Sequence, residues 1–308
     1  MSGKVFCIGH VSVDAVENVN GSKAQPGGAA LYAAVAAKTL FNDICLISAV
    51  GNNYPFTDIL ALFPRRYLKS SRMPSTRFSI RYDERWEAHY LKADYGAGTK
   101  ISSSLIDSAK IEPNSIVHIS PLPPARAQKI VRSIRKTSPE TKISINTWIG
   151  YMESGKNRRI LKELASEVDF LIMNDSEAKV LAEAETLSTA LRLLKAKMLI
   201  VTLGELGAIT NTENEVRMVP ALSFPIEKIM DTTGAGDTWC GAFIAAYKLT
   251  GDLVKSITAA SVISSIKCTG WGFNKLLNLR FKSVDTIAEY IIGLREGSIQ
   301  KRIPDFSP

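Results

Sequence analysis

Short apolar segments alternate with amphipathic segments of helical length along most of the chain. The apolar segments are rich in β-branched residues and carry apolar side chains at consecutive positions, as strands covered on both faces do. This alternation predicts a mainly parallel sheet with helices on both of its faces. The expected strands lie at 5–8, 44–49, 116–119, 142–145, 170–173 and 198–202. The expected helices lie at 29–40, 125–137, 156–166, 176–184, 236–250 and 253–268.

One region has a different pattern. Apolar and polar residues alternate along 75–82 and again along 86–91, on either side of the polar loop 83–85. Alternation with a period of two around a short polar loop is the signal for a half-exposed antiparallel hairpin. The extended segment 14–19 is expected to pair with this hairpin, so that both form a small β flap on the α/β body. No internal repeat or long linker interrupts 1–308, and we expect a single domain.

The composition is typical of a soluble globular protein. Of the 308 residues, 45% are hydrophobic and 22% are charged, which excludes a disordered or collagen-like chain. The net charge of +8 comes from scattered basic residues, which indicates solvated faces rather than a stripe that binds nucleic acid. The four cysteines form no CxxC pair, and no uncharged apolar run approaches the ~18 residues of a membrane helix. We therefore expect a cytoplasmic protein that binds neither nucleic acid nor a membrane.

The most informative motif precedes an apolar helix and reads Asp231-Thr232-Thr233-Gly234-Ala235-Gly236-Asp237. Its glycines let the backbone turn tightly where the helix begins. Free backbone amides and the positive end of the helix dipole meet there, so the turn can bind an anion without a lysine. Asp237 lies in the first helical turn, where a carboxylate can accept the proton of an attacking hydroxyl. The motif therefore predicts phosphoryl transfer. The simpler interpretation, in which the glycines and Asp237 only cap the helix, is disfavoured for the full motif.

With these residues the chain resembles the ribokinase-like carbohydrate kinases, the PfkB family, whose C-terminal signature is similar to the motif 231–237. Further motifs follow in the family's order, and the resemblance extends from about residue 4 to residue 293. They are Asp14 after the first strand, Pro26-Gly27-Gly28-Ala29-Ala30 at a helix start, Asn174-Asp175-Ser176-Glu177, and Thr202-Leu203-Gly204. The resemblance implies an α/β fold: a three-layer α/β/α sandwich with a mainly parallel central sheet. It also implies a small β lid, formed by about 12–26 and 75–92.

The resemblance implies an ATP-dependent kinase that transfers the γ-phosphate to a hydroxyl of a sugar or sugar-like molecule. The residues implied for catalysis are the base Asp237 and the amides of Gly234, Ala235 and Gly236 as an anion hole. The residues implied for binding the acceptor are Asp14, Gly27 and Gly28. The residues implied for binding the nucleotide are Asn174, Thr202, Gly204 and Thr233. Glu177 would hold Mg²⁺ through water, since Mg²⁺ keeps several waters and usually needs only one or two carboxylates besides phosphate oxygens.

Departures from the family pattern concern the choice of acceptor. Tyr32 stands where many sugar kinases of the family carry asparagine, His10 replaces an acidic or amide residue, and Asn53 stands where aspartate is frequent. The short lid and the Gly-Gly-Ala-Ala-x-Tyr string are similar to the cyclitol and nucleoside branches, so a myo-inositol or a nucleoside is an alternative acceptor. Three aromatic residues are candidates for stacking on a sugar or a base, or for packing of the hairpin: Trp86, Tyr90 and Trp271.

Other interpretations remain at this point. The segment 268–272 lies where the family often builds its adenine pocket and sometimes binds a monovalent cation, which is a further candidate ligand. ADP is an alternative donor, and the chain is either a monomer or a homodimer. A non-catalytic nucleotide- or sugar-binding sensor is the alternative from a different class. A dinucleotide-dependent oxidoreductase is disfavoured, because no GxGxxG follows the first strand.

Overall fold

The computed structural model describes residues 3–221 and 229–287, so the last part of the resemblance, 288–293, lies outside the described residues. Within these residues, nine strands form the central sheet. In spatial order they are β13 (Val216–Pro220), β12 (Gly207–Asn211), β11 (Leu199–Thr202), β10 (Phe170–Asn174), β9 (Lys142–Asn146), β8 (Ile116–Ile119), β1 (Val5–Ile8), β4 (Ile44–Gly51) and β5 (Leu68–Ser71). Neighbouring strands are parallel, except that β12 runs antiparallel to β11 and β13.

The strand order reverses between β1 and β8. From β1 the chain adds β4 and β5 on one side of the sheet, and from β8 it adds the remaining strands in sequence on the other side. In open parallel sheets, ligands bind in the crevice outside the carboxyl ends of the strands at such a reversal. The topology therefore places the expected site at one edge of the sheet.

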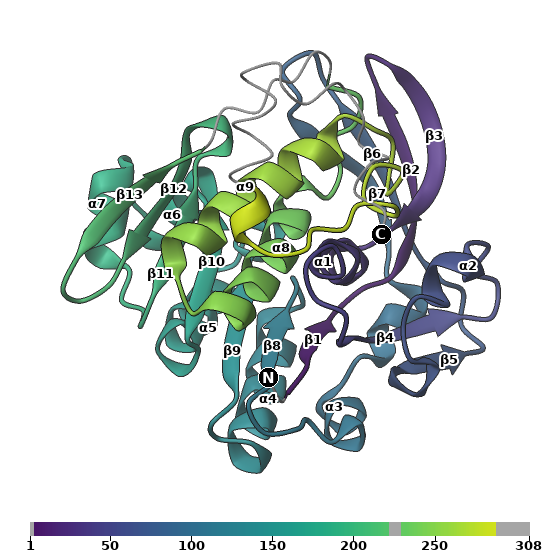
Figure 1. The fold of residues 1–308 in the computed structure, drawn as a ribbon, viewed down its shortest axis with the longest axis horizontal. Helices are drawn as coiled ribbons and strands as arrows, with labels where there is room; N and C mark the ends of the chain where they lie inside the picture. Colours follow the sequence, from purple (N-terminus) through teal and green to yellow (C-terminus); the bar gives the residue numbers. More distant parts are fainter. Residues whose placement is uncertain (1–2, 222–228, 288–308) are drawn as a thin grey trace.

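Helices cover both faces of the sheet (Figure 1). The helices are α1 (Ala29–Ala37), α2 (Thr57–Leu60), α3 (Ser103–Ala109), α4 (Pro124–Thr137), α5 (Gly155–Glu167), α6 (Asp175–Ala182), α7 (Leu187–Leu193), α8 (Ala235–Thr250) and α9 (Leu253–Cys268). Val5 and Cys7 of β1 join a core with α1, α8 and α9, whereas Phe6 and Ile8 join a core with α4, α5 and α6. Successive side chains of a strand point to opposite faces, so strands that are apolar throughout serve both cores. The predicted three-layer fold is confirmed.

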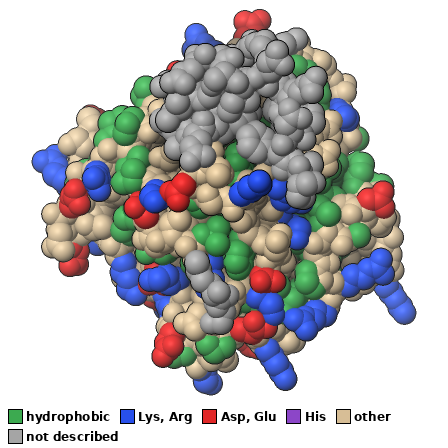
Figure 2. Space-filling view, in the orientation of Figure 1, with side chains coloured by type: hydrophobic (Ala, Val, Ile, Leu, Met, Phe, Trp, Pro, Cys, Tyr) green, Lys and Arg blue, Asp and Glu red, His purple; other side chains and the backbone are tan. Residues whose placement is uncertain are grey.

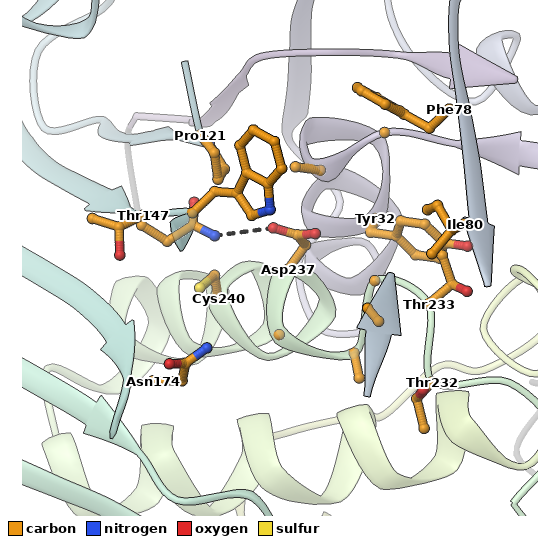
Figure 3. Close-up of a pocket in the computed structure, with 18 of the residues that line it drawn as sticks. Tyr32, Phe78, Ile80, Pro121, Thr147, Asn174, Thr232, Thr233, Asp237 and Cys240 are labelled. Carbon is orange, nitrogen blue, oxygen red and sulfur yellow. Dashed lines mark hydrogen bonds between the residues drawn. The ribbon is translucent and has the colours of Figure 1, made fainter. Parts of the chain in front are cut away.

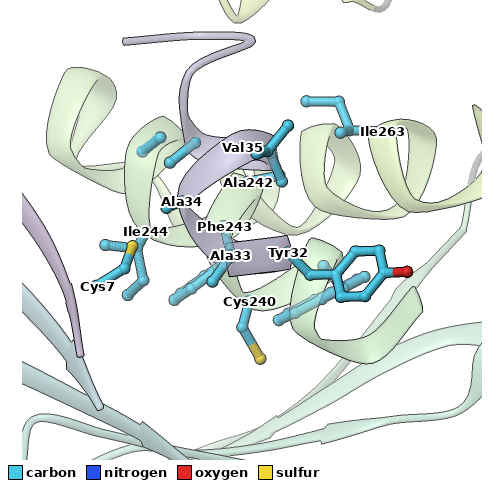
Figure 4. Close-up of a cluster of buried hydrophobic side chains, with 14 of the residues drawn as sticks. Cys7, Tyr32, Ala33, Ala34, Val35, Cys240, Ala242, Phe243, Ile244 and Ile263 are labelled. Atoms are coloured by element: carbon cyan, nitrogen blue, oxygen red, sulfur yellow. The ribbon is translucent and has the colours of Figure 1, made fainter. Parts of the chain in front are cut away.

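The alanine-rich helix α1 packs directly against α8, as Figure 4 shows. Gly241 of α8 makes this close approach possible, since a Cβ there would lie only 2.0 Å from the carbonyl oxygen of Ala33. Tyr32 of α1 is buried and stacks on Phe273 with ring centroids 4.3 Å apart. This packing fixes the first turn of α8 relative to the sheet.

A second sheet has the strand order β3 (Gly21–Gly27), β2 (Ser12–Asn18), β6 (Thr76–Tyr82) and β7 (Ala88–Asp94). It lies beside the carboxyl ends of the central strands (Figure 1). β2 pairs in parallel with β6, which joins the predicted extended segment to the predicted hairpin. The inner face of this sheet carries a small apolar cluster of Val16, Ile80 and Tyr82.

The hairpin differs from its prediction at the turn. The second strand starts at Ala88 rather than at Trp86, so the connection comprises 83–87. Trp86 has a φ of 63°, the left-handed conformation that closes the turn. The register also shifts between Ser79 and Ile80. These irregularities depend on local backbone geometry, which the alternation of apolar and polar residues does not predict.

The view in Figure 2 shows basic and acidic side chains interspersed on one face of the molecule. No helix of the described residues is long and apolar enough to cross a membrane. The four cysteines are free and buried.

Candidate active site

A cavity of about 400 Å³ lies between the carboxyl ends of the central strands, the start of α8 and the second sheet (Figure 3). Its wall brings together ten of the twelve residues proposed from the sequence. They are Asp14, Gly28, Asn174, Glu177, Thr202, Thr233, Gly234, Ala235, Gly236 and Asp237. The other two are placed differently: Gly27 packs behind Asp14, and Gly204 lies in a turn after β11 outside the cavity wall.

The motif 231–237 forms a tight turn that opens α8. Gly234 is the residue before the helix and has a φ of 71°. A Cβ at this position would lie 2.3 Å from the ring of Tyr32, so glycine is required by both conformation and space. The amide of Ala235 donates to the carbonyl of Thr232 at 3.0 Å, which closes the turn. The positive end of α8 therefore faces the cavity.

Asp237 is half-buried at the floor of the cavity. Burial raises the pKa of its carboxyl group to about 6, although a hydrogen bond from Asn146 opposes the rise. This bond joins the Asn146 Nδ2 and Asp237 Oδ1 atoms over 2.9 Å and is the dashed line in Figure 3. A carboxylate with a pKa close to neutrality can take up a proton during a reaction and release it afterwards. The sequence analysis missed Asn146, although it lies at the carboxyl end of β9, where parallel sheets collect polar ligand-binding residues.

Asp14 also lines the cavity and is buried, with 3% of its surface exposed. Burial raises the pKa of its carboxyl group to about 7, while hydrogen bonds from Ser12 and the Gly28 backbone oppose the rise. The Ser12 hydroxyl donates to Asp14 Oδ1 at 2.6 Å. A Cβ on Gly27 would lie 1.8 Å from Asp14 Oδ2, so this glycine is what lets the carboxylate occupy its place.

Asn174 and Glu177 form a capping box at the start of α6. The Glu177 amide donates to Asn174 Oδ1 at 2.8 Å, and Glu177 Oε2 accepts from the Asn174 amide at 3.2 Å. The Thr147 hydroxyl also donates to Glu177 Oε2, at 2.8 Å. Burial raises the pKa of Glu177 to about 7, so a nearby cation would favour its ionised form. Thr147 follows β9 and Asn174 ends the neighbouring strand β10, while Glu177 lies in the first turn of α6.

Thr202 and Thr233 also line the cavity. The Thr202 hydroxyl donates to the carbonyl of Met173 at 3.3 Å. The Thr233 amide donates to Asp231 Oδ1 at 2.9 Å, so its position is set by the turn. Among the described residues no group of three or more His, Cys, Asp or Glu side chains is arranged to hold a metal ion.

The end of the cavity under the second sheet has an aromatic wall. Tyr90 of β7 contacts Trp148 edge to face with ring centroids 5.1 Å apart, and Trp148 contacts Tyr151 at the same distance. These contacts connect the second sheet to the loop after β9. The aromatic side chains in the wall are Phe78, Tyr82, Trp86, Tyr90, Tyr95, Trp148 and Tyr151. Tyr95, Trp148 and Tyr151 were not predicted, because they lie in loops without a periodic pattern.

His10 lines the same cavity and is 4% exposed. Neither of its ring nitrogens has a hydrogen-bond partner among the described residues. Burial, followed by the nearby charge of Arg126, lowers the pKa of His10 to about 4, so the imidazole is neutral. The ring lies against Tyr95 with centroids 5.4 Å apart. Both ring nitrogens are covered by protein atoms, and Nδ1 faces Gly98, where a Cβ would lie only 2.2 Å away.

The other residues singled out in the sequence have structural contacts. Tyr32 fills space beneath Gly234, although its ring also reaches the cavity wall. Asn53 Oδ1 accepts hydrogen bonds from the amide and hydroxyl groups of Ser75, at 2.9 and 3.0 Å, outside the cavity. Trp271 packs on the apolar cluster of the second sheet and does not line the cavity.

The sequence matches a model of the pfkB family of carbohydrate kinases over residues 2–276. A cytidine kinase from Thermococcus kodakarensis is 28% identical over 248 residues, which cover 78% of this chain and 87% of that protein. A ribokinase from Bacillus subtilis is 27% identical over 268 residues, which cover 83% of this chain and 86% of that protein. Among solved structures, a Burkholderia thailandensis nucleoside kinase in complex with inosine superposes with a TM-score of 0.75 at 18% identity. That superposition covers 95% of this chain and 98% of the other.

Proposed function

The chain belongs to the pfkB family of carbohydrate kinases and is a phosphotransferase that acts on a hydroxyl group, and we propose that its acceptor is a nucleoside. The donor is ATP, which kinases of this family use. The observation that carries the proposal is the aromatic wall at the end of the cavity where Asp14 and His10 lie. We also propose that 1–308 is one kinase domain, with about 12–26 and 75–92 as its lid.

A nucleoside has two parts that need different surroundings. Its ribose hydroxyls suit Asp14, whose carboxylate can accept hydrogen bonds from them. Gly27 makes room for that carboxylate, and Gly28 lines the cavity. Its base is flat and suits aromatic faces, on which bases stack with about 1–3 kcal/mol each. A free pentose, hexose or inositol is smaller than a nucleoside and would contact less of the aromatic wall.

The residues that would contact the base belong to the aromatic wall, whereas both ring nitrogens of His10 are covered by protein atoms. Tyr90, Trp148 and Tyr151 would stack on the base or close over it. The names of the similar proteins, a cytidine kinase and a nucleoside kinase, support a nucleoside acceptor.

Phosphoryl transfer would proceed by in-line attack on the γ-phosphate. The acceptor oxygen forms the new bond to phosphorus as the bond between phosphorus and the β,γ-bridging oxygen breaks, which leaves ADP. The hydroxyl proton goes to the Asp237 carboxylate, whose pKa of about 6 makes it ionised at neutral pH. The backbone amides of Gly234, Ala235 and Gly236 at the start of α8 stabilise the developing charge on the transferred group.

The nucleotide would occupy the remaining part of the cavity, beside Asn174, Thr202 and Thr233. Gly204, outside the wall, would act by shaping the turn that follows β11. Mg²⁺ suits the donor set here, because Glu177 is a single buried carboxylate and Mg²⁺ retains water and binds phosphate oxygens. Bound Mg²⁺ would neutralise charge on the phosphates.

The proposal is tested by measuring ADP release from Mg·ATP with nucleosides, pentoses, hexoses and inositols as acceptors. We expect kcat/KM for at least one nucleoside to exceed that for its free sugar by about tenfold or more, since one stacked base contributes about 1–3 kcal/mol. Trp148→Ala should raise KM for the nucleoside and leave KM for ATP unchanged. Trp271→Ala is the matched control, since Trp271 lies outside the cavity. Preferential turnover of a free sugar or an inositol would contradict the nucleoside assignment, and nucleotide binding without turnover of any acceptor would favour a sensor.

A further inference from the structure

Lys267 is fully buried at the end of α9. No other lysine of residues 3–221 and 229–287 is buried in this way. Its ammonium group donates to the carbonyl oxygen of Asp231 at 2.7 Å and lies 3.3 Å from Asp231 Oδ2. Neither side chain of this ion pair has any solvent exposure. The ammonium also faces the ring of Tyr32, 5.4 Å from its centroid.

Asp231 is the first residue of the turn that opens α8. Its Oδ1 atom accepts a hydrogen bond from the Thr233 amide at 2.9 Å. Its Oδ2 atom accepts from the Gln25 side chain and from the Gly272 amide, both at 3.0 Å. The carboxylate therefore joins the turn to the lid strand β3 and to the segment 268–272.

The charges of this pair depend on each other. Burial alone would raise the pKa of Asp231, but the Lys267 ammonium and the hydrogen bonds outweigh burial and hold that pKa below 3.8. Burial lowers the pKa of Lys267, and the attraction of Asp231 opposes the change. A buried carboxylate without a cation beside it would be costly and would also repel phosphate at the adjacent anion site.

We propose that the ammonium group of Lys267 takes the place of a bound monovalent cation, so that this kinase needs no potassium or sodium ion for its activity. Lys267 is then a positioning residue that acts through Asp231 on the anion-binding turn. The proposal rests on the kinase function, but not on which acceptor is used. It concerns the region beside 268–272, for which the family resemblance makes a monovalent cation a candidate ligand.

The donor set supports this assignment. A monovalent metal ion needs oxygen ligands that are free to coordinate it, and the oxygens of Asp231 that face this region are hydrogen-bonded to an ammonium group, an amide side chain and a backbone amide. A second cation beside Lys267 would also be repelled by its charge. The residues present therefore do not fit a free ion. Because the ammonium is covalently attached, it cannot dissociate at low salt concentration.

The first test uses the wild-type enzyme. ADP release from Mg·ATP is measured with an accepted substrate in potassium, sodium, ammonium or choline chloride at one ionic strength. We expect the rates to agree within about twofold, because a site that is already filled gains nothing from added ion. An increase of about tenfold or more in potassium over choline, the size of an allosteric coupling, would overturn the proposal.

Two variants make the test independent of wild-type behaviour. Lys267→Ala opens space for an ion, and we expect its rate in choline to fall by about tenfold or more and to recover saturably with ammonium or potassium. Lys267→Met fills the space without a charge and should lose activity without such recovery. Lys255→Ala, on the exposed face of the same helix, is the control and should behave like the wild type in every salt.

Thermal melting supplies a readout that needs no acceptor. We expect the wild type to have the same melting temperature in potassium chloride as in choline chloride. We expect Lys267→Ala to have a higher melting temperature in potassium chloride than in choline chloride. A Lys267→Ala protein that is fully active in choline, or one that no cation rescues or stabilises, would show that the lysine does not stand in for an ion. If the acceptor assignment fails, the melting comparison keeps its meaning.

Discussion

Asn146 donates a hydrogen bond of 2.9 Å to Asp237, and so connects the end of β9 with the first turn of α8. The two residues are 91 positions apart in the chain, and the parallel sheet brings them together. The bond favours the ionised form of Asp237 and opposes the effect of burial. It also holds the carboxylate in one orientation at the floor of the cavity. Asn146 is therefore expected to tune the catalytic base.

Removing this hydrogen bond should change the pH dependence of the enzyme. In the wild type, kcat/KM should rise with pH through about 6, because only ionised Asp237 can accept the proton. In Asn146→Ala the pKa of Asp237 should increase, which moves this limb to higher pH and lowers kcat/KM at pH 6 by about tenfold. Asn53→Ala, outside the cavity, should leave the limb in place. An unmoved limb in Asn146→Ala would show that the bond does not act on the base.

Gly234, the last residue of the anion-binding turn before α8, should tolerate no side chain. Gly234→Ala places a Cβ in the ring of Tyr32 and in a backbone conformation with φ of 71°, so both stability and turnover should fall. We expect kcat to drop by at least about tenfold, since displaced anion-site donors cost 10²–10³ in rate when lost entirely. Thermal melting and steady-state kinetics check both effects.

Gly251→Ala is the matched control for this variant. Gly251 has a similar φ of 65°, but nothing lies within 4 Å of its position for a Cβ. Its substitution should cost about 1–2 kcal/mol of stability from backbone conformation alone and leave turnover unchanged. Equal effects of the two substitutions would show that the contact with Tyr32 does not matter.

The buried carboxyl groups should make the ligand-free enzyme less stable as the pH rises. The pKa of Asp14 is about 7, compared with 3.8 ordinarily, and that of Glu177 is about 7, compared with 4.5. The folded protein therefore holds protons that the unfolded chain has already lost, so stability decreases as the pH rises through about 7. His10 and His118, whose pKa values burial lowers to about 4, destabilise the fold only below about 6.5.

We expect the free energy of unfolding to fall by about 1.5 kcal/mol between pH 6.5 and pH 8, measured by urea denaturation without nucleotide. Asp14→Asn should remove about half of this decrease, because the substituted amide does not titrate. Stability that stays constant over this interval would mean that Asp14 and Glu177 titrate with ordinary pKa values in the folded enzyme.

Most of the central sheet could be predicted from the sequence, because strands that are apolar throughout leave a clear signal. The interior strand β12 was missed, since its sequence includes Gly207, Thr210 and Asn211. The edge strand β13 left no such signal, since four of its five residues are exposed and their side chains follow no apolar pattern. β3 contains Pro26 and two glycines, and it becomes a strand by pairing with β2. Edge strands depend on their partners, which a local pattern does not contain.

The residues of the site also fall into two groups, those that a local motif predicts and those whose partners are distant in the sequence. Short motifs indicated the turn 231–237 and the capping box of Asn174, because the residues of each motif are neighbours in the chain as well as in space. Asn146 and Lys267 were missed, since each acts on a partner that is distant in sequence. Within a mainly apolar helix, nothing local distinguishes Lys267 from a lysine that reaches solvent. Only the packing of α9 beside the turn gives it a role.

Turnover of the Asp237→Asn variant tests the central claim most directly. We measure ADP release with Mg·ATP and the preferred acceptor, together with ATP affinity by calorimetry. The variant should keep its fold and bind ATP with nearly unchanged affinity, while kcat falls by about 10²–10⁴, the contribution of a general base. A variant that binds ATP and turns over at the wild-type rate would contradict the assignment of Asp237 as the base that accepts the hydroxyl proton.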